Sequence, residues 1–159
     1  MDHIDFTTPY RPVPSTDVPP LFNHSSPDGD QKKTSIVLNS YMDVITFLMF
    51  VRDTAQLLHW ATYKFSTHIA MGEFCDGLED LIDDMAEMMM GSEETMDFST
   101  ADTVSHQLPK APCDFMAAVR TTMIDAGHLF DHEPALKNKY DEIIGLINKT
   151  KYKIDRLVS

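Results

Sequence analysis

The sequence has few cysteines and few basic residues, and both shortages exclude classes of protein. Of its 159 residues only Cys75 and Cys113 are cysteines, and no CxxC spacing occurs. A disulfide framework and a zinc ribbon are therefore not expected, and a reducing compartment is indicated. Lys and Arg number 13 against 25 Asp and Glu, which gives a formal net charge of -12. Because so acidic a chain repels phosphate backbones, we expect no nucleic-acid binding.

Long apolar segments are also missing. The first residues, MDHIDF, have neither the basic start nor the apolar run of a signal peptide. The longest apolar run, VITFLMFV, is too short to cross a bilayer. These features predict a soluble, cytoplasmic protein that does not contact membranes.

Proline is concentrated at one end of the chain. Six of the nine prolines lie in residues 1–33. Proline lacks a backbone donor and favours extended backbone, so no regular secondary structure is expected there. Residues 1–33 are predicted to be a Pro-rich arm that is either disordered or extended against neighbouring subunits.

Residues 34–159 are predicted to form one all-α domain. Apolar residues recur at three- and four-residue steps, and no strand pattern occurs. The predicted helices cover about residues 35–60, 67–91, 114–130 and 134–157. Gly91 is the expected C-cap of the second helix, and residues 92–113 read as a linker with little structure. Four long helices with a long middle connection describe an antiparallel four-helix bundle.

The first predicted helix has apolar residues on more than one face. Its inward stripe includes Val44, Leu48 and Val51, whereas Phe47 and Phe50 lie at or beyond the edge of that stripe. An apolar surface wider than one face indicates a further partner. We therefore expect self-association, at least into a two-fold dimer.

Two histidines and two acids stand out as candidate metal ligands: His59, His68, Asp83 and Glu87. Asp83 and Glu87 are four residues apart, which places them on one helical face. His68 and Asp83 would lie roughly 22 Å apart on one straight helix, too far to share an ion. A site that uses all four residues therefore needs a second copy of this helix, antiparallel across a two-fold axis. The alternative is that both histidines are structural and the acids form a solvated face.

The segment LLHWATYKFSTHIAMGEFCDGLEDLIDDMAE resembles the ferroxidase motif of the Dps-type mini-ferritins. The resemblance implies a ferritin-like bundle that forms a homo-oligomer and binds iron at a two-fold interface. His59 and His68 of one chain and Asp83 and Glu87 of another would be the ligands, and Trp60 falls on the tryptophan that follows the first histidine. The resemblance further implies iron sequestration and a ferroxidase activity that oxidises Fe(II) with oxygen or peroxide.

The chain also departs from the pattern of that family. Its two histidines are closer together than in the family, which implies a tighter turn and makes His59 the least secure ligand. Gly72 stands where many members carry an aspartate, which implies one carboxylate fewer. Members that bind DNA often use a basic tail, whereas the tail of this chain is Pro-rich and slightly acidic.

Several alternatives stay open at the level of sequence. Imidazole and carboxylate ligands suit Zn, Mn or Co as well as iron. Asp125 and His128 form an Asp-x-x-His step, which is a second candidate for a metal inside one bundle. The chain is also similar to uncharacterised ferritin-like proteins of phages and large viruses, which would place it in the host cytoplasm or the virion. It would then be a structural or assembly protein with a vestigial metal site.

Overall fold

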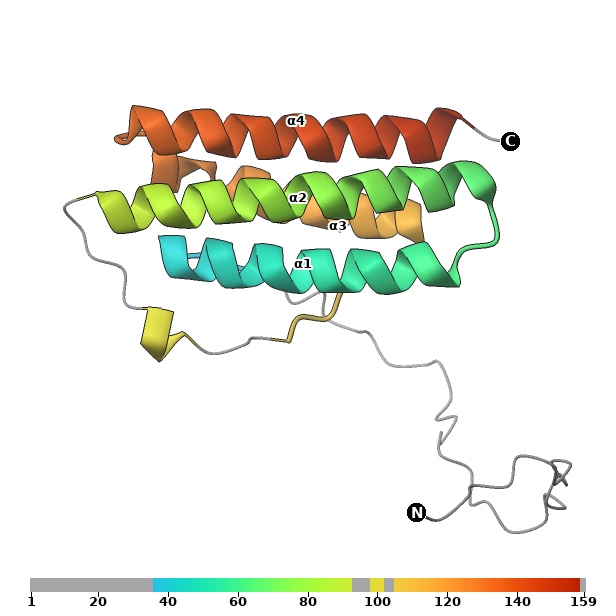
Figure 1. Ribbon diagram of the computed structural model, residues 1–159, viewed down its shortest axis with the longest axis horizontal. Coiled ribbons are helices and arrows are strands. Elements are labelled where there is room, and N and C mark those ends of the chain that lie inside the picture. Colours follow the sequence, from blue (N-terminus) through green and yellow to red (C-terminus); the bar gives the residue numbers. More distant parts are fainter. Residues whose placement is uncertain (1–35, 93–97, 102–104, 158–159) are drawn as a thin grey trace, which may run out of the picture. The chain divides into compact units, whose positions relative to one another are not determined.

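A computed structural model describes residues 36–92, 98–101 and 105–157 of the chain (Figure 1). The chain divides between residues 33 and 34 into two units, and all described residues belong to the second. The predicted arm, residues 1–33, lies outside the described residues. None of the described helices is both long enough and apolar enough to cross a membrane.

The described part of the chain is helical and contains no strand, so the prediction of an all-α chain with four long helices is confirmed. The four α-helices are α1 (Tyr41–Ala61), α2 (Phe65–Gly91), α3 (Pro112–Asp125) and α4 (Pro134–Arg156). Two short 3-10 helices, η1 (Phe98–Thr100) and η2 (Ala126–Phe130), complete the elements.

Several helix ends differ from the predicted ones, and capping explains two of the differences. Helix α1 begins at Tyr41 rather than near residue 35 because the Ser40 side chain accepts a hydrogen bond from the Asp43 amide at 3.1 Å. Helix α2 begins two residues earlier than predicted, so the turn before it is shorter. Gly91 is the last residue of α2 and not its cap. Ser92 ends the helix in extended conformation, and its amide donates to the carbonyls of Met88 and Met89.

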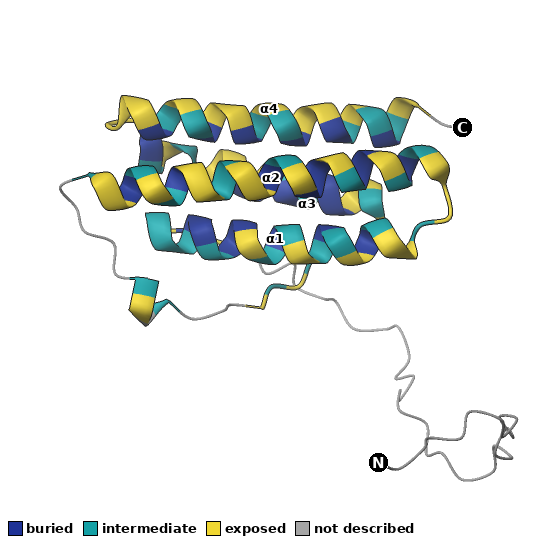
Figure 2. Cartoon of the chain, in the orientation of Figure 1, coloured by how far each residue is buried: buried dark blue, intermediate teal, exposed yellow. Residues whose placement is uncertain are grey.

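Each helix is antiparallel to the helices beside it (Figure 1). Helix α1 packs against α2, α2 against α4, α4 against α3, and α3 has a smaller contact with α1. Helices α2 and α3 lie diagonally across the bundle and run in the same direction. The connection between them must therefore run back along the full length of the bundle. Side chains that face inward from all four helices form one buried core (Figure 2). Its largest fully buried aromatic members are Phe47, Phe74, Phe115 and Phe130.

Part of the wide apolar surface of α1 is covered by the chain's own α2–α3 connection. The His106 ring packs edge-on against the rings of Phe47 and Phe50, with centroids 5.3 and 5.4 Å away. This contact covers the two phenylalanines that suggested a second partner. Self-association of the chain therefore stays a prediction.

We expect the docking of His106 on α1 to depend on pH. Burial lowers the pKa of His106, and the negative charge of Asp43 opposes this effect only in part. Docking is therefore complete above the ordinary histidine pKa of about 6.5 and weakens as the pH falls below it, because only the undocked ring then gains a proton. An NMR titration of the His106 ring should give a pKa below the ordinary value, and Phe50→Ala should raise it. A wild-type ring that titrates at the ordinary value would contradict this docking.

Candidate metal centre

The two predicted histidine ligands lie against each other across the turn between α1 and α2. Their rings stack with centroids 3.9 Å apart and planes inclined by 25°. The Nδ1 atom of His59 lies 2.7 Å from the carbonyl oxygen of His68, and Nδ1 of His68 lies 3.0 Å from the carbonyl oxygen of His59. The shortened turn therefore does not separate the two rings; it stacks them.

These two hydrogen bonds decide which nitrogen of each ring can bind a ligand. A carbonyl oxygen can only accept, so each Nδ1 must carry the proton. In the neutral rings the lone pair then lies on Nε2, on both His59 and His68. Metal-binding histidines commonly have this arrangement, because a donated Nδ1–H fixes the tautomer and the orientation of the ring. The bond from His68 also satisfies one of the last carbonyls of α1, which has no partner within the helix.

Gly72 provides the space that His59 occupies. A Cβ atom built at this position would lie 3.0 Å from Cε1 and 3.2 Å from Nδ1 of the His59 ring. The tighter turn therefore requires a glycine at position 72, because the side chain of an aspartate there would displace the His59 ring.

Gly72→Ala is expected to move His59 and disrupt the stacked pair. Alanine favours the helix by up to about 1 kcal/mol over glycine, so α2 itself should not be weakened. We expect a large change in the His59 ring resonances in NMR spectra and no loss of helical signal in circular dichroism. Gly145→Ala on α4 is the matched control, because its added Cβ would meet nothing within 4 Å apart from its chain neighbours and the backbone of its own helix. Unchanged His59 resonances in Gly72→Ala would contradict the close contact.

The two predicted carboxylate ligands lie on α2, far from the histidine pair of the same chain. Asp83 and Glu87 are both exposed, and α2 continues without a break from His68 to both of them. Among the described residues no three His, Cys, Asp or Glu side chains come together to hold a metal. One chain therefore brings the histidines together and leaves the carboxylates apart from them, as the spacing predicted.

The second candidate pair does not converge on a site. His128 Nδ1 bonds the backbone carbonyl of Asp125 at 2.8 Å, and both side chains are exposed. Cys75 is buried in α2, and burial, the largest cause, raises its pKa to about 11, so it remains a thiol near neutral pH.

Helix α2 carries seven acidic residues and no lysine or arginine, and the structure divides the acids into two groups. Three of them pair with neighbouring helices: Glu73 with Lys153, Glu79 with Arg52, and Asp84 with Lys139. The other four have no ion pair among the described residues and recur at steps of four, three and four, so they form one exposed stripe. This acidic stripe consists of Asp76, Asp80, Asp83 and Glu87.

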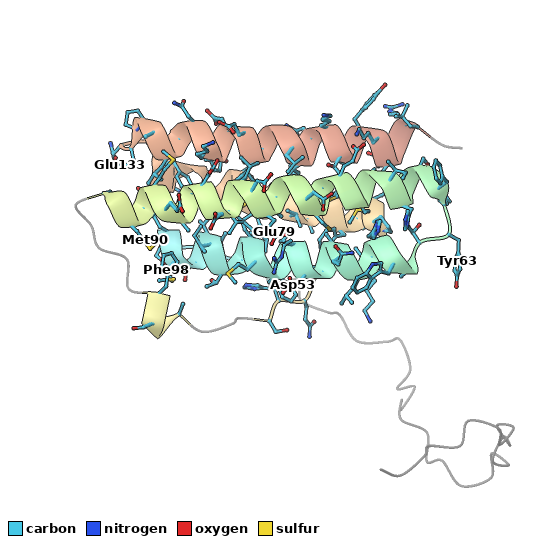
Figure 3. All side chains as sticks on the ribbon, viewed as in Figure 1. Asp53, Tyr63, Glu79, Met90, Phe98 and Glu133 are labelled. Carbon is cyan, nitrogen blue, oxygen red and sulfur yellow. The ribbon has the colours of Figure 1, made fainter. Side chains whose placement is uncertain are left out.

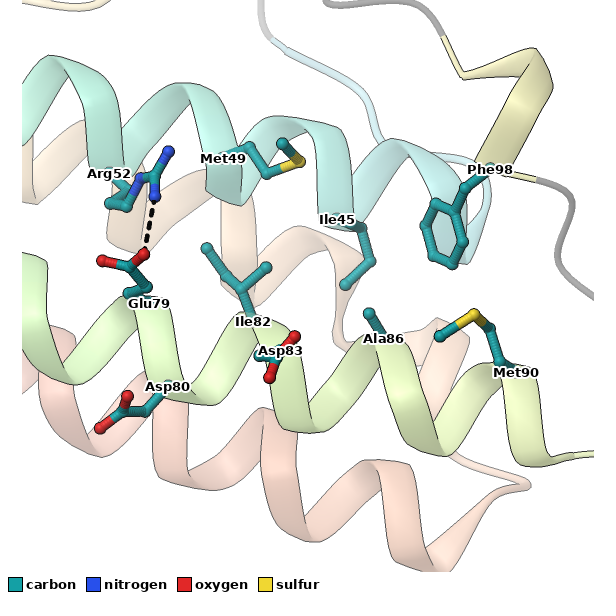
Figure 4. A pocket seen from close by; sticks show the side chains of 10 residues that line it. All are labelled: Ile45, Met49, Arg52, Glu79, Asp80, Ile82, Asp83, Ala86, Met90 and Phe98. Carbon is teal, nitrogen blue, oxygen red and sulfur yellow. Dashed lines mark ion pairs between the residues drawn. The ribbon is translucent and has the colours of Figure 1, made fainter.

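A groove of about 600 Å³ runs between α1 and α2 and includes Asp83 (Figure 4). Most of its lining is apolar, and η1 contributes Phe98. At one end of the groove Arg52 of α1 pairs with Glu79 of α2 at 3.3 Å (Figure 4). Arg52 is not among the residues predicted for the site, although its seven-residue spacing from His59 places both residues on one side of α1. The apolar lining residues are Ile45, Met49, Ile82, Ala86, Met90 and Phe98.

Large apolar side chains are exposed around the turn that joins α1 and α2. Trp60 is 68% exposed, Phe65 is 73% exposed, and Tyr63 points entirely into solvent (Figure 3). Monomeric proteins seldom expose several large aromatic side chains together without a partner for them. We call this surface the turn-end patch; it comprises Leu57, Trp60, Tyr63, Phe65 and Ile69.

Comparison with known proteins assigns the chain to a family. The chain belongs to the family described as "Family of unknown function (DUF5856)", whose model matches residues 59–154. The matched range begins at His59 and contains all four predicted ligands. No curated protein and no solved structure matches the chain.

Proposed function

We propose that this protein is a Dps-like member of the ferritin-like proteins that binds iron between two copies of the chain. The observation that carries the proposal is the stacked histidine pair, in which both Nδ1 atoms donate to carbonyls and both Nε2 atoms can bind a metal. His59 and His68 of one copy and Asp83 and Glu87 of another would be the ligands. The order of the helices supports the ferritin-like fold, because ferritin-like bundles have one long crossover connection.

The chemistry of these ligands suits Fe(II) as a substrate. Imidazole and carboxylate together bind Fe(II), and also Zn, Mn or Co. Carboxylates stabilise the more highly charged ferric product, and a small set of protein ligands leaves positions for an oxidant. The functions that follow are ferroxidase activity and iron sequestration, without binding of DNA.

Anaerobic titration with Fe(II), followed by addition of oxygen or peroxide, tests this function. Wild-type protein should bind Fe(II) and give ferric absorbance faster than buffer does. Asp83→Ala should remove most binding, because it removes an anionic ligand. His59→Ala and His68→Ala should each weaken binding by at least about ten-fold, because both rings are held in the same way.

His128→Ala is the matched control for the histidine variants. Its Nδ1 also bonds a backbone carbonyl, and it lies at the opposite end of the helices from the stacked pair. Asp125→Ala should also leave binding unchanged. Binding that depends on Asp125 and not on Asp83 would place the metal inside one bundle.

The turn-end patch favours a second candidate function. Exposed Trp60 and Phe65 are suited to protein contact whether or not a metal binds. The chain would then be a structural or assembly protein, for instance of a virus particle. Absence of metal binding in the wild type and in every variant would favour this function over the first.

A further inference from the structure

The turn-end patch and the groove are complementary in polarity and charge. Residues 54–72, which contain the patch, include no acidic residue and one lysine, Lys64. The groove has an apolar lining and an acidic side that includes Asp80 and Asp83. A neutral to basic aromatic surface and an apolar groove with carboxylates at its edge fit each other.

Both surfaces lie on the pair of helices α1 and α2, at opposite ends. The patch surrounds the turn after α1, whereas the groove extends toward the end of α2 that contains Met90. On α2, Phe65 and Ile69 of the patch are followed on the same side of the helix by the acidic stripe, which begins seven residues after Ile69, at Asp76. A two-fold axis across the middle of α2 would therefore bring each patch onto the groove of the other copy, twice per dimer.

One register of two antiparallel α2 helices would bring all of these residues level with their proposed partners at once. If His68 of one copy lies level with Asp83 of a second copy, Phe65 lies level with Ala86 and Ile69 with Ile82. Ala86 and Ile82 both line the groove. The same register puts Lys64 level with Glu87, a pair of opposite charges. The apolar pairs, the Lys64–Glu87 pair and the metal-ligating residues thus share one alignment, and only the repulsion between the two acidic stripes opposes it.

We propose that the turn-end patch of one copy docks into the α1–α2 groove of a second copy, reciprocally across a two-fold axis, and that this docking builds the shared metal site. The inference rests on the proposed function for its register and names the partner surface of that site. Docking brings two acidic stripes together, so a cation held between the histidines and the carboxylates should strengthen it.

Sedimentation velocity at micromolar concentration tests the docking, with Zn²⁺ as the probe because it is not oxidised. The wild-type chain should associate, and Zn²⁺ should strengthen association by about ten-fold or more relative to EDTA, as linkage to a bound ligand requires. Mg²⁺ should not replace Zn²⁺, because it binds oxygen ligands and not imidazole. Equal strengthening by Mg²⁺ would mean general charge screening and would overturn the role of the site.

Variants on the two surfaces identify the contact. Trp60→Ala combined with Phe65→Ala should weaken association by at least about ten-fold, because buried aromatic anchors dominate such contacts. Met49→Glu, which puts a charge into the groove, should do the same. Tyr152→Ala is the control, since it deletes an exposed aromatic side chain from α4. Association unaffected by both patch and groove variants would overturn the docking.

Charge reversal tests the register itself. Lys64→Glu should weaken association, because it places a second negative charge level with Glu87 of the other copy. Lys110→Glu makes the same change in charge at an exposed position before α3 and should have no effect. Equal effects of the two variants would contradict the register.

The outcomes separate the docking from the iron function. Association through the patch that is the same in EDTA and in Zn²⁺, without metal binding, would retain the docking and remove the iron function. Iron binding that needs Asp83, in a chain whose patch variants associate normally, would remove the docking and retain the iron function. A monomer that binds lipid vesicles through Trp60 and Phe65 would show that a membrane occupies the patch instead.

Discussion

Mixing a His68→Ala chain with an Asp83→Ala chain is expected to restore iron binding that neither variant has alone. In the proposed two-fold dimer each site would take its histidines from one copy and its carboxylates from the other. A mixed dimer therefore combines the intact histidines of one variant with the intact carboxylates of the other, at one of its two sites. Random mixing should restore about one quarter of the wild-type binding capacity.

Complementation of this kind excludes a site within a single chain. If His68 and Asp83 bound metal within one copy, every copy in the mixture would carry one defect and no binding would return. The measurement is Fe(II) bound per chain at equilibrium under anaerobic conditions, after the variants have been mixed under conditions that allow subunit exchange. A mixture of His68→Ala with His59→Ala is the matched control, because neither chain has an intact histidine pair. Recovery in that control as well would contradict the assignment of ligands.

The spacing of the candidate ligands could be interpreted from the sequence because it depends only on the rise of a helix. His68 and Asp83 are too far apart on any straight helix to share an ion, and the structure places both on one unbroken α2. The number of helices and the helical class followed in the same way from the apolar period. The ligand spacing and the helical class both depend on residues close together in the sequence, so the rise and period of a helix are enough to predict them.

The geometry of the histidine pair could not be predicted, because it depends on a turn of three residues between α1 and α2. From the sequence alone, the short spacing between the histidines predicts that His59 is the least secure ligand. In the structure the turn is short enough for each ring to reach the backbone of the other helix, and Gly72 leaves the space for it. The formation of both hydrogen bonds depends on where the two helices lie relative to each other.

The sequence also could not predict which acidic residues of α2 form ion pairs and which do not. Arg52, Lys139 and Lys153 come from α1 and α4, and only the packing of those helices shows which acids they pair with. The acids that pair flank α2 on both sides, and the acids that do not pair are left on its outward face. Exposed ion pairs of this kind contribute little to stability, so their main effect is on the charge of the surface. They leave the acidic stripe as the part of α2 with the highest unpaired charge.

Phe130→Ala is expected to cause the largest loss of stability among single substitutions outside the candidate metal centre. Phe130 is fully buried at the end of the α3–η2 segment, and its ring lies 5.5 Å from that of Tyr41 on α1 and 4.8 Å from that of Tyr140 on α4. The tyrosine hydroxyls donate to the carbonyls of Leu129 and Met123, each at 3.0 Å. This aromatic cluster joins α1, η2 and α4, and so ties the α3–η2 segment to α1, although α3 itself has only a small contact with α1. Truncating a buried phenylalanine costs about 3–5 kcal/mol, from a total stability of about 5–15 kcal/mol for a domain of this size.

The measurement is urea denaturation followed by circular dichroism, with Phe65→Ala as the matched control. Phe65 undergoes the same chemical truncation but is 73% exposed in the single chain. Its effect on the free energy of unfolding should stay within about 0.5 kcal/mol at concentrations where the chain is monomeric. Phe130→Ala should lower the midpoint clearly and leave the slope unchanged if the unfolding remains two-state. Equal midpoints for the two variants would mean that the cluster does not hold α1, η2 and α4 together. A loss in Phe65→Ala that appears only at high protein concentration would instead report the proposed contact between copies, in which a second chain would cover that ring.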